Sequence, residues 1–228
     1  MTSTLRVERE GPVARVWLDR PDVRNALNGV LIRELAAAFA AFCAEDTGVR
    51  VIVLGGSGKA FCAGADLAFM REAAAYSWEQ NRADAERLAA MLWSMYTCPV
   101  PVVARLHGDC YAGGLGLASV CDIRVAVPEA TFCLSEARLG LLPATISPYV
   151  VRAMGDQAAR RYFVTAERFS GAERDDHLAV ERVADVGPVE PDARDRSGAL
   201  DAQGLAHRCL PWACVTVVLV VESSRPRG

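Results

Sequence analysis

The sequence predicts an α/β fold, and three observations support this prediction. Short apolar stretches typical of buried strands, such as residues 49–54, alternate with stretches of helical periodicity. Two such strands run directly into glycine-rich loops, at residues 55–66 and 108–116. The chain has 228 residues, of which 52% are hydrophobic and 23% are charged. This composition is typical of a globular protein with one large core or, at most, two small domains.

The first quarter of the chain contains a predicted hairpin, a helix and a strand. The stretches LRVERE and VARVWLD alternate apolar and polar residues on either side of Gly11-Pro12, which predicts a β-hairpin. Pro21 ends the second strand, and Asn28 is well placed to cap a helix. The apolar residues of that helix recur at helical spacing: Leu31, Leu35, Phe39 and Phe42. Residues 49–54 are predicted to be a strand that is buried on both faces.

The middle of the chain repeats this alternation. A helix is expected from about Trp78 to Tyr96, ended by the Cys98-Pro99 break. We then expect a strand at PVVARLHG, a helix start at AGGLGLASV, strands at CDIRVAV and TFCLSE, and a helix over residues 147–163. Ligands of open α/β folds bind at the loops that follow the strands. We therefore expect the loops at 55–66 and 108–116 to open on a common side.

The composition argues against several kinds of partner. The net charge of −3 disfavours nucleic acid, because phosphate binding needs a basic face. The longest apolar runs, such as residues 212–221, are shorter than the roughly 20 residues of a bilayer-spanning helix. The sequence starts without a basic-then-apolar signal segment, so we expect a cytoplasmic protein. The eight cysteines form no C-x-x-C pair, and we expect buried free thiols rather than disulfides or a metal site.

The stretch VIVLGGSGKAFCAGADL begins like a phosphate-binding loop, but two positions exclude that motif. A P-loop needs a glycine five residues before the Gly-Lys pair and a Ser or Thr after it, and those positions hold Val53 and Ala60. The serine-hydrolase motif G-x-S-x-G also fails, because Lys59 stands where its last glycine should be. The sequence therefore does not predict a nucleotide site or a serine nucleophile here.

The small residues of the two loops suggest that a ligand is recognised by the backbone. Residues 63–65 allow close approach to the main chain, and Asp66 precedes a helix start, where amide hydrogens are unpaired. The stretch HGDCYAGGLGLAS repeats this arrangement, with glycines at a helix N-terminus. Two backbone donors that face one point would form an oxyanion hole. Alternatively, Gly113 and Gly114 only allow close helix packing, and spacing alone does not decide between these interpretations.

Four motifs resemble the crotonase family, also called the enoyl-CoA hydratase/isomerase family: RPDVRNALN, AFCAGADL, YAGGLGLASVCDIRVA and ATFCLSEARLGLLPATISPYVVRAMG. They stand in the family's order and span about Leu5 to about Ser170. The resemblance implies a crotonase-like spiral of ββα repeats that assembles as a homotrimer or hexamer. It also implies an acyl-CoA substrate and no cofactor other than the coenzyme A that the substrate carries.

The resemblance further implies which residues form the site. In the family, two backbone amides form an oxyanion hole for the thioester oxygen, and their positions match Ala65 and Gly113. The loop that usually touches the coenzyme A moiety contains Val23, Arg24 and Ala26. The other predicted substrate-binding residues are Ala63, Asp66, Leu67, Ala68 and Gly114.

Family hydratases generally use two glutamates, and this sequence matches one of them. Glu136, in LSEARLGL, matches the second, and an apolar pocket can raise the pKa of such a carboxyl group toward neutrality. The position of the first glutamate holds Gly116. A single glutamate fits a Δ3,Δ2-enoyl-CoA isomerase. However, the stretch around Glu136 most resembles bacterial 3-methylglutaconyl-CoA hydratase-like members, which also lack the first glutamate. We therefore expect hydration, with Glu136 as base and proton carrier, and keep isomerisation as the alternative.

Other conspicuous residues are expected to be structural. Nothing near His107 would orient it as a base, and His177 and His207 fall in the C-terminal segment. Asp122 matches a family position that is usually structural. A set of large side chains is expected to pack in the core or to form an acyl-chain wall: Met70, Met91, Trp93 and Met95.

The character of the sequence changes near residue 173. We predict a core at residues 1–172 and an atypical segment at 173–228, with weak periodicity, dense Arg and Asp, and an apolar run, VTVVLVV, without a clear place. Divergence explains this segment, and so does a reading-frame change near Arg174, because Arg, Ala, Gly and Pro are abundant in GC-rich DNA read out of frame. The rival functional hypothesis is therefore a non-catalytic crotonase-fold protein that binds acyl-CoA and has a defective C-terminus.

Overall fold

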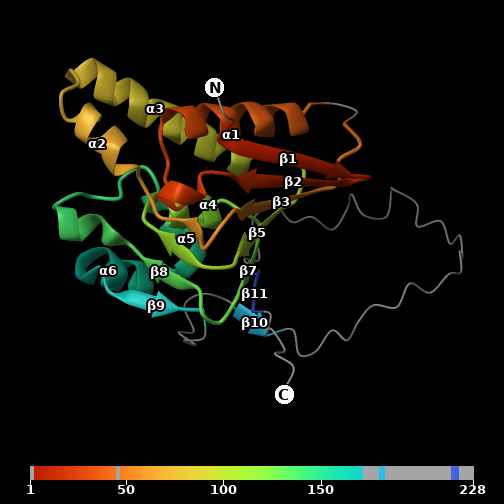
Figure 1. Ribbon diagram of the computed structural model, residues 1–228. Helices are drawn as coiled ribbons and strands as arrows, with labels where there is room; N and C mark the ends of the chain where they lie inside the picture. Colours follow the sequence, from red (N-terminus) through yellow and green to blue (C-terminus); the bar gives the residue numbers. More distant parts are fainter. Residues whose placement is uncertain (1–2, 45–46, 172–179, 183–216, 221–228) are drawn as a thin grey trace, which may run out of the picture.

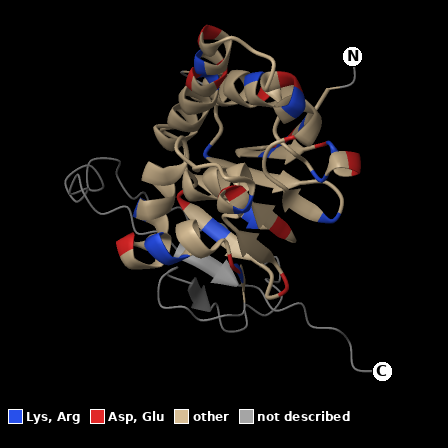
Figure 2. Ribbon diagram, turned by 90° about the vertical axis from the view of Figure 1, so that its left-hand side faces the viewer, with Lys and Arg blue, Asp and Glu red and all other residues tan. Residues whose placement is uncertain are grey.

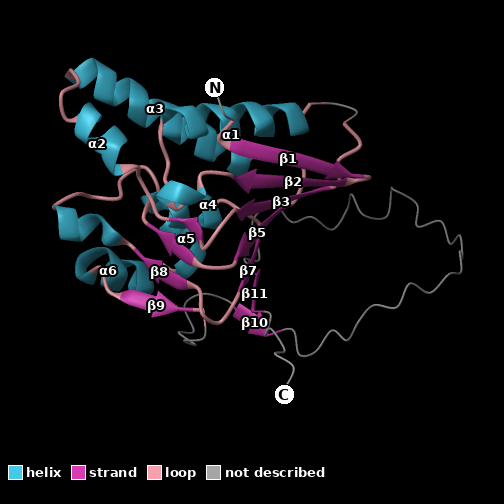
Figure 3. Ribbon diagram, viewed as in Figure 1, coloured by secondary structure: helices cyan, strands magenta, loops and turns pink. Residues whose placement is uncertain are grey.

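The computed structural model describes residues 3–44, 47–171, 180–182 and 217–220 (Figure 1). The strands form a seven-stranded sheet, in the order β1-β2-β3-β5-β7-β11-β10, and a four-stranded sheet, in the order β4-β6-β8-β9. Helices lie against both sheets, as the colouring by secondary structure shows (Figure 3). The predicted α/β class is confirmed.

The large sheet begins with the predicted hairpin. Strands β1 (Leu5–Glu10) and β2 (Val13–Leu18) pair antiparallel, with Leu5 opposite Leu18 and Glu10 opposite Val13. From β2 onward the neighbours are parallel, through β3 (Val51–Gly56), β5 (Val102–Leu106) and β7 (Ile123–Ala126). On these strands fully buried positions alternate with partly exposed ones: Ile52 and Leu54 of β3 are fully buried, whereas Val51 and Val53 are only partly buried. The prediction that this strand is buried on both faces is therefore wrong for the face of Val51 and Val53.

The second sheet consists of strands of three residues each. β4 (Ala60–Cys62), β6 (Asp109–Tyr111) and β8 (Thr131–Cys133) are parallel neighbours, and β9 (Arg168–Ser170) pairs antiparallel with β8. Each of β3, β5 and β7 is thus followed by a short strand of the second sheet and then by a helix. This repetition is the predicted spiral of ββα units.

The two longest helices begin with side-chain caps that the sequence makes visible. In α1 (Gly29–Phe42), the Asn28 side chain accepts a hydrogen bond from the Leu31 amide at 2.9 Å, as predicted. In α3 (Trp78–Tyr96), Ser77 and Gln80 form a capping box. The two helices pack against each other beside β1 (Figure 1).

The helix predicted over residues 147–163 is divided into two. These are α5 (Ser147–Met154) and α6 (Asp156–Thr165), separated by Gly155 with φ of 83°. The Gly155 amide donates to the Val151 carbonyl at 2.8 Å and so ends α5 with a left-handed residue, where glycine is favoured. The remaining helices are α2 (Leu67–Ala73), α4 (Gly113–Ser119) and the short 3₁₀ helices η1 (Pro21–Val23) and η2 (Ser135–Leu139).

Two described strands come from the C-terminal segment. β11 (Val217–Val220) lies parallel to β7, and β10 (Val180–Arg182) lies parallel to β11. Part of the apolar run near the end of the sequence therefore has a place in the large sheet. The rest of the segment at 173–228, with His177 and His207, lies outside the described residues, so its predicted character stays a prediction.

The six cysteines within the described ranges are free, as expected, but two of them are only half-buried. Burial raises the pKa of both Cys62 and Cys121 to about 12, which keeps these thiols protonated and unreactive. Cys43, at the end of α1, and Cys98, after α3, are the half-buried pair, and their sulfur atoms are 3.0 Å apart. The expectation of buried thiols is therefore wrong for these two.

The charged residues are of mixed sign over the surface. In the ribbon view of Figure 2, basic and acidic positions are scattered over the elements, and both signs occur along the helices. Among the helices that the structure describes, none combines the length and apolarity needed to cross a membrane.

Candidate active site

The two glycine-rich loops lie side by side because the strands before them are neighbours. β4 and β6 are parallel, with Cys62 opposite Cys110, so their loops leave the sheet at the same edge. The loops then touch: a Cβ added to Gly64, which has φ of 94°, would lie 2.8 Å from the Cβ of Ala112 and 3.7 Å from the Gly113 nitrogen. The predicted common side of the two loops is confirmed.

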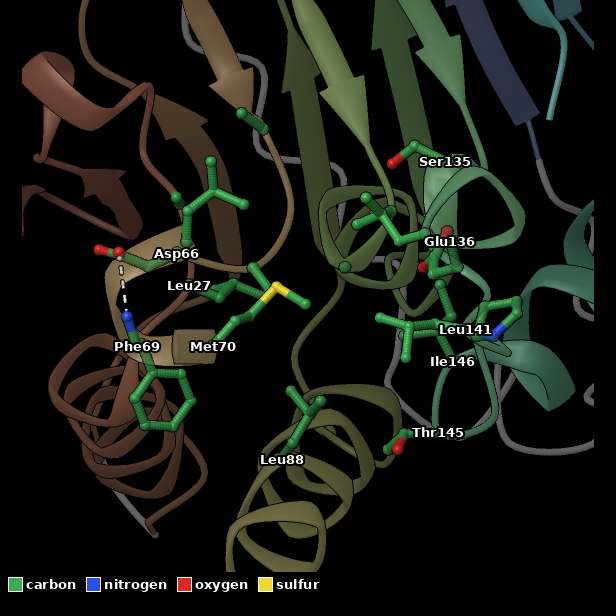
Figure 4. Close-up of a pocket in the computed structure, with 18 of the residues that line it drawn as sticks. Leu27, Asp66, Phe69, Met70, Leu88, Ser135, Glu136, Leu141, Thr145 and Ile146 are labelled. Atoms are coloured by element: carbon green, nitrogen blue, oxygen red, sulfur yellow. Dashed lines mark hydrogen bonds between the residues drawn. The ribbon is translucent and has the colours of Figure 1, made fainter. Parts of the chain in front are cut away.

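A cavity of about 660 Å³ opens between these loops, η2, and the segment that leads into α5. Figure 4 shows Leu27, Asp66 and Met70 on one side, with Glu136 and Ile146 on the other. Nearly all of the predicted site residues line this cavity: Val23, Arg24, Ala26, Ala63, Ala65, Asp66, Leu67, Ala68, Gly113 and Glu136.

The amides of Ala65 and Gly113 both lie at this cavity without a hydrogen-bond acceptor among the described residues. Leu27 is hydrogen-bonded to both neighbours of Ala65. The Leu27 amide donates to the Gly64 carbonyl at 2.7 Å, and the Leu27 carbonyl accepts from the Asp66 amide at 2.8 Å. In such a parallel bridge, the polar groups of Ala65 itself point away from Leu27. Gly113 is the first residue of α4, whose start has no side-chain cap, so its amide has no partner within the helix.

Among the described residues, Glu136 is the one carboxyl-bearing residue on its side of the cavity (Figure 4). It lies in η2, which follows shortly after β8. Its Oε2 atom is buried and has no hydrogen-bond partner in the described part of the chain. Burial raises the pKa of Glu136, although its own backbone amide opposes the shift. A buried, unpartnered carboxyl group of this kind is suited to exchanging protons with a ligand.

The loop that contains Val23, Arg24 and Ala26 is fixed to the β3–β4 connection by a buried asparagine. Asn25 is fully buried and adopts φ of 57°. Its side chain accepts from the Arg20 amide at 2.9 Å and donates to the carbonyls of Ser57 at 2.8 Å and Ala60 at 2.9 Å. Asparagine suits this place because it tolerates the left-handed conformation and can both accept and donate.

Replacing Asn25 by Ala is expected to destabilise the protein by about 3 kcal/mol, because buried carbonyls lose their donors and alanine disfavours positive φ. Urea unfolding followed by circular dichroism would measure this loss. Asn25→Gly is the matched control, since glycine keeps the backbone conformation without strain and isolates the side-chain hydrogen bonds. An Ala variant as stable as the wild type would contradict the anchoring role.

Asp66 is held by structural contacts rather than being free to bind a ligand. Its Oδ1 accepts from the Ala68 amide at 2.9 Å and caps α2, and its Oδ2 pairs with Nη2 of Arg20 at 2.8 Å. Burial favours a raised pKa for Asp66, but the hydrogen bond and charge of Arg20 and the helix amides outweigh it and lower the pKa. The structure therefore gives this predicted binding residue a positioning role: it sets the start of α2 beside Ala65.

Asp66→Asn is expected to lower the free energy of unfolding by about 2 kcal/mol at pH 7, because the charge-assisted bonds are lost. Since the folded-state pKa of Asp66 is lowered, its contribution is complete above the unfolded pKa of about 4 and disappears as the pH falls below it. The difference between variant and wild type should therefore shrink at pH 3. Denaturation at both pH values tests this. Asp156→Asn, at an exposed ion pair with Arg160, is the control and should change little.

Two glycines have packing roles. Gly114, predicted to bind substrate, is not among the residues that line the cavity, and a Cβ there would lie 2.5 Å from the Cys62 carbonyl oxygen. Glycine at this position lets α4 approach β4, so we correct the binding role to a packing role. At Gly116 a Cβ would lie 2.3 Å from Cγ2 of Ile146. The place of the missing first glutamate is therefore filled by a neighbouring side chain.

Part of the cavity wall was not predicted from the sequence. It comes from the segment between η2 and α5, together with Leu88 of α3 and Ile32 of α1. The leucines of this segment are exposed, with 44% of Leu141 and 86% of Leu142 accessible. A run of apolar residues next to a proline and between helices was the available signal, because a solvated loop would be polar.

The remaining candidates agree largely with their expected structural roles. His107 bonds the Gly58 carbonyl through Nε2 at 2.9 Å and does not line the cavity, and Asp122 accepts from the Val102 amide at 2.8 Å. Met91 and Met95 are buried in the core, whereas Met70 lines the cavity and Trp93 is exposed. In the part of the chain that is described, no cluster of His, Cys, Asp or Glu could hold a metal ion.

Comparison with known proteins identifies the family. The model of the enoyl-CoA hydratase/isomerase family matches residues 8–208. An enoyl-CoA hydratase of Alternaria alternata is 40% identical over 166 residues, which are 71% of this chain and 52% of that protein. The mitochondrial enoyl-CoA hydratase domain-containing protein 2 of Bos taurus is 32% identical over 209 residues, 91% of this chain and 68% of its own length. The chain thus spans about half of the Alternaria relative.

Solved structures support the same assignment. An enoyl-CoA hydratase from Shewanella pealeana superposes with a TM-score of 0.71 at 44% identity, over 73% of this chain and 63% of that one. An enoyl-CoA hydratase from Mycobacterium smegmatis gives a TM-score of 0.70 at 37% identity, over 74% and 65% of the two chains. Together with the spiral of ββα units, these matches lead to one conclusion: the chain belongs to the enoyl-CoA hydratase/isomerase family.

Proposed function

We propose that this protein adds water across the 2,3 double bond of an acyl-CoA thioester. The observation that carries the proposal is the meeting of two unpartnered amides, at Ala65 and Gly113, with the unpartnered carboxyl group of Glu136 at one cavity. Addition to an enoyl thioester passes through an enolate, so it needs donors for the oxygen and a proton carrier near the carbon atoms.

The amides would hold the thioester oxygen. Negative charge accumulates on this oxygen as water attacks C3, and fixed donors in a water-poor site stabilise it without reorganising. Gly113 adds the positive end of the dipole of α4 to its own amide. The adjacent residues Val23, Arg24 and Ala26 would contact the coenzyme A portion of the substrate, as the resemblance implies.

Glu136 would carry the proton. Its carboxylate takes a proton from the water that attacks C3, and the resulting carboxylic acid returns a proton to C2 of the enolate. Burial raises the pKa of Glu136 and so makes its protonated form more accessible, which helps one group to act first as base and then as acid. This scheme needs one carboxyl group and no second acid at position 116.

An isomerase is the second candidate, and the contact between Gly116 and Ile146 favours it. With an apolar side chain in place of a second acid, Glu136 would take a proton from C2 of a 3-enoyl-CoA and return it to C4. This reaction consumes no water, so the substrate and product have the same mass.

Incubation with crotonyl-CoA and, separately, with a 3-enoyl-CoA distinguishes the candidates by product mass together with the absorbance of the conjugated 2-enoyl thioester, which an isomerase forms from the 3-enoyl substrate. A hydratase yields a 3-hydroxyacyl-CoA from crotonyl-CoA, heavier by one water. An isomerase converts only the 3-enoyl substrate, without a change in mass. Binding of both thioesters without conversion would support the rival proposal of a non-catalytic acyl-CoA-binding protein. Size-exclusion mass adds a second criterion, since we propose a trimer for the enzyme and expect a monomer or aggregate for a compromised fold.

A further inference from the structure

The cavity wall next to Glu136 is shaped by a contact between a glycine and an isoleucine. Ile146 lines the cavity with 3% of its surface exposed, and it packs on Gly116 of α4. A Cβ at position 116 would lie 2.3 Å from Cγ2 and 2.9 Å from Cβ of Ile146. The isoleucine thus occupies the space that any side chain at position 116 would need. The cavity wall on the side of Glu136 is therefore formed there by an apolar side chain rather than by a second acid.

Ile146 is held firmly in this place. Its carbonyl accepts hydrogen bonds from the amides of Tyr149 at 3.1 Å and Val150 at 3.0 Å in the first turn of α5. The next residue, Ser147, bonds the Pro143 carbonyl through its amide at 3.0 Å and its hydroxyl at 2.7 Å. A β-branched side chain on such a backbone has little rotamer freedom. These bonds fix the position of Ile146 in the cavity wall.

The charges of the cavity are distributed unevenly. Among its described lining residues, Asp22 and Arg24 come from η1 and its end, and Asp66 comes from the loop before α2. Glu136 lies across the cavity from Asp66, together with Leu141 and Ile146 (Figure 4). No described cation lines the cavity beside Glu136. An acyl chain that ended in a carboxylate would bring a second anion to this side, where burial already disfavours the charge of Glu136.

We propose, on the basis of the proposed function, that Ile146 is a specificity-determining residue and that the site takes short, uncharged hydrocarbon acyl chains. Packed on Gly116, it ends the acyl pocket and gives it an apolar surface. Such a site discriminates against longer chains and against chains that carry a second carboxylate. The inference runs against the resemblance to 3-methylglutaconyl-CoA hydratase-like members, because a glutaconyl chain ends in a carboxylate.

Calorimetric binding of saturated thioesters tests this inference without requiring turnover. Pentanoyl-CoA and glutaryl-CoA have acyl chains of equal carbon number and differ in a terminal methyl or carboxylate, so their ratio isolates the charge. We expect the wild type to bind pentanoyl-CoA at least about 10-fold more tightly than glutaryl-CoA. An effect of this size is usual when one group of a ligand does not match its pocket. Equal affinities would overturn the inference.

Ile146→Ala tests the length limit. It is expected to improve octanoyl-CoA binding about 10-fold relative to butyryl-CoA, because the pocket deepens. Ile52→Ala, at a fully buried position of β3 away from the cavity, is the matched control: it should lose stability and keep the wild-type profile. An unchanged profile in Ile146→Ala would overturn the role of Ile146.

A double substitution tests the contact itself. Gly116→Ala is expected to weaken butyryl-CoA binding, and adding Ile146→Ala should restore it, because the space taken by one methyl group is released by the other residue. Additive effects of the two changes would contradict the contact. The proposed function and the role of Ile146 fail in different ways. If no thioester binds, the proposed function fails. If the wild type hydrates crotonyl-CoA and Ile146→Ala keeps the wild-type binding profile, only the role of Ile146 fails.

Discussion

Replacing Glu136 by Gln is expected to reduce kcat/KM for crotonyl-CoA by about 10²- to 10⁴-fold, which corresponds to the usual effect of general acid–base catalysis. Gln has the shape of the carboxyl group but cannot take a proton from water or return one to C2. Hydration assayed by absorbance of the enoyl thioester measures this loss. Binding of butyryl-CoA should change little, because it depends on the two amides and the apolar walls.

The same substitution is expected to stabilise the fold. Because the folded-state pKa of Glu136 is raised, the group favours the folded state below its unfolded pKa of about 4.5, and that contribution is lost as the pH rises through the folded value. Near neutral pH the wild type therefore bears the cost of a buried charge that the Gln variant lacks. Urea unfolding should show a gain at pH 7 and none at pH 4.

The exposed Glu129 provides a control of the same chemistry, and Glu129→Gln should leave activity and stability unchanged. Undiminished turnover in Glu136→Gln would remove the proton-carrying role. A loss of both turnover and butyryl-CoA binding would indicate that Glu136 shapes the site instead of taking part in the reaction.

Gly113→Pro is expected to reduce kcat by about 10²- to 10³-fold, the typical effect of removing one oxyanion-hole donor. Proline lacks the amide hydrogen, and the first position of a helix is where proline is best tolerated. Ala112 before it has φ of 49° and ψ of −118°, outside the extended region that a residue before proline prefers, so the turn into α4 has to adjust. Stopped-flow or steady-state hydration of crotonyl-CoA would measure the effect, and circular dichroism would report the helix content.

Gly113→Ala is the matched control for this substitution. It adds the same Cβ, 2.9 Å from Cδ1 of Leu27, while keeping the amide hydrogen. The flexible end of Leu27 can shift to accommodate it, so the loss should be several-fold at most. Equal losses in the Ala and Pro variants would mean that crowding at Leu27, rather than the amide, matters at this position.

Much of the fold could be predicted from the sequence because its signals are local. Alternation around Gly11-Pro12 predicts the hairpin, and the observed α3 has the predicted ends, Trp78 and Tyr96. The stretch TFCLSE predicts β8, but β4, β6 and β9 are too short for a periodic signal, since they are defined by pairing with distant segments. The division of the last predicted helix at Gly155 was missed because the apolar spacing continues across a left-handed residue.

The candidate site was predictable where motifs mark it and not where side chains from distant segments meet. Ala65, Gly113 and Glu136 could be located by the family's motifs, and all three line one cavity. The loss of a glutamate at Gly116 was visible, but its replacement by Ile146, thirty positions away, depends on how α4 packs on α5. The structural contacts of Asp66 likewise depend on Arg20, which belongs to a different segment.

The position of Leu27 has a consequence for how a bound thioester is recognised along its length. This residue ends the loop of Val23–Ala26, bonds both neighbours of Ala65, and touches the space beside Gly113. The coenzyme contacts that we propose for residues 23–26 would therefore be mechanically connected to the geometry around the thioester carbonyl. A truncated thioester such as an N-acetylcysteamine derivative should consequently react more slowly even at saturation, because distant attraction helps to align the reacting atoms.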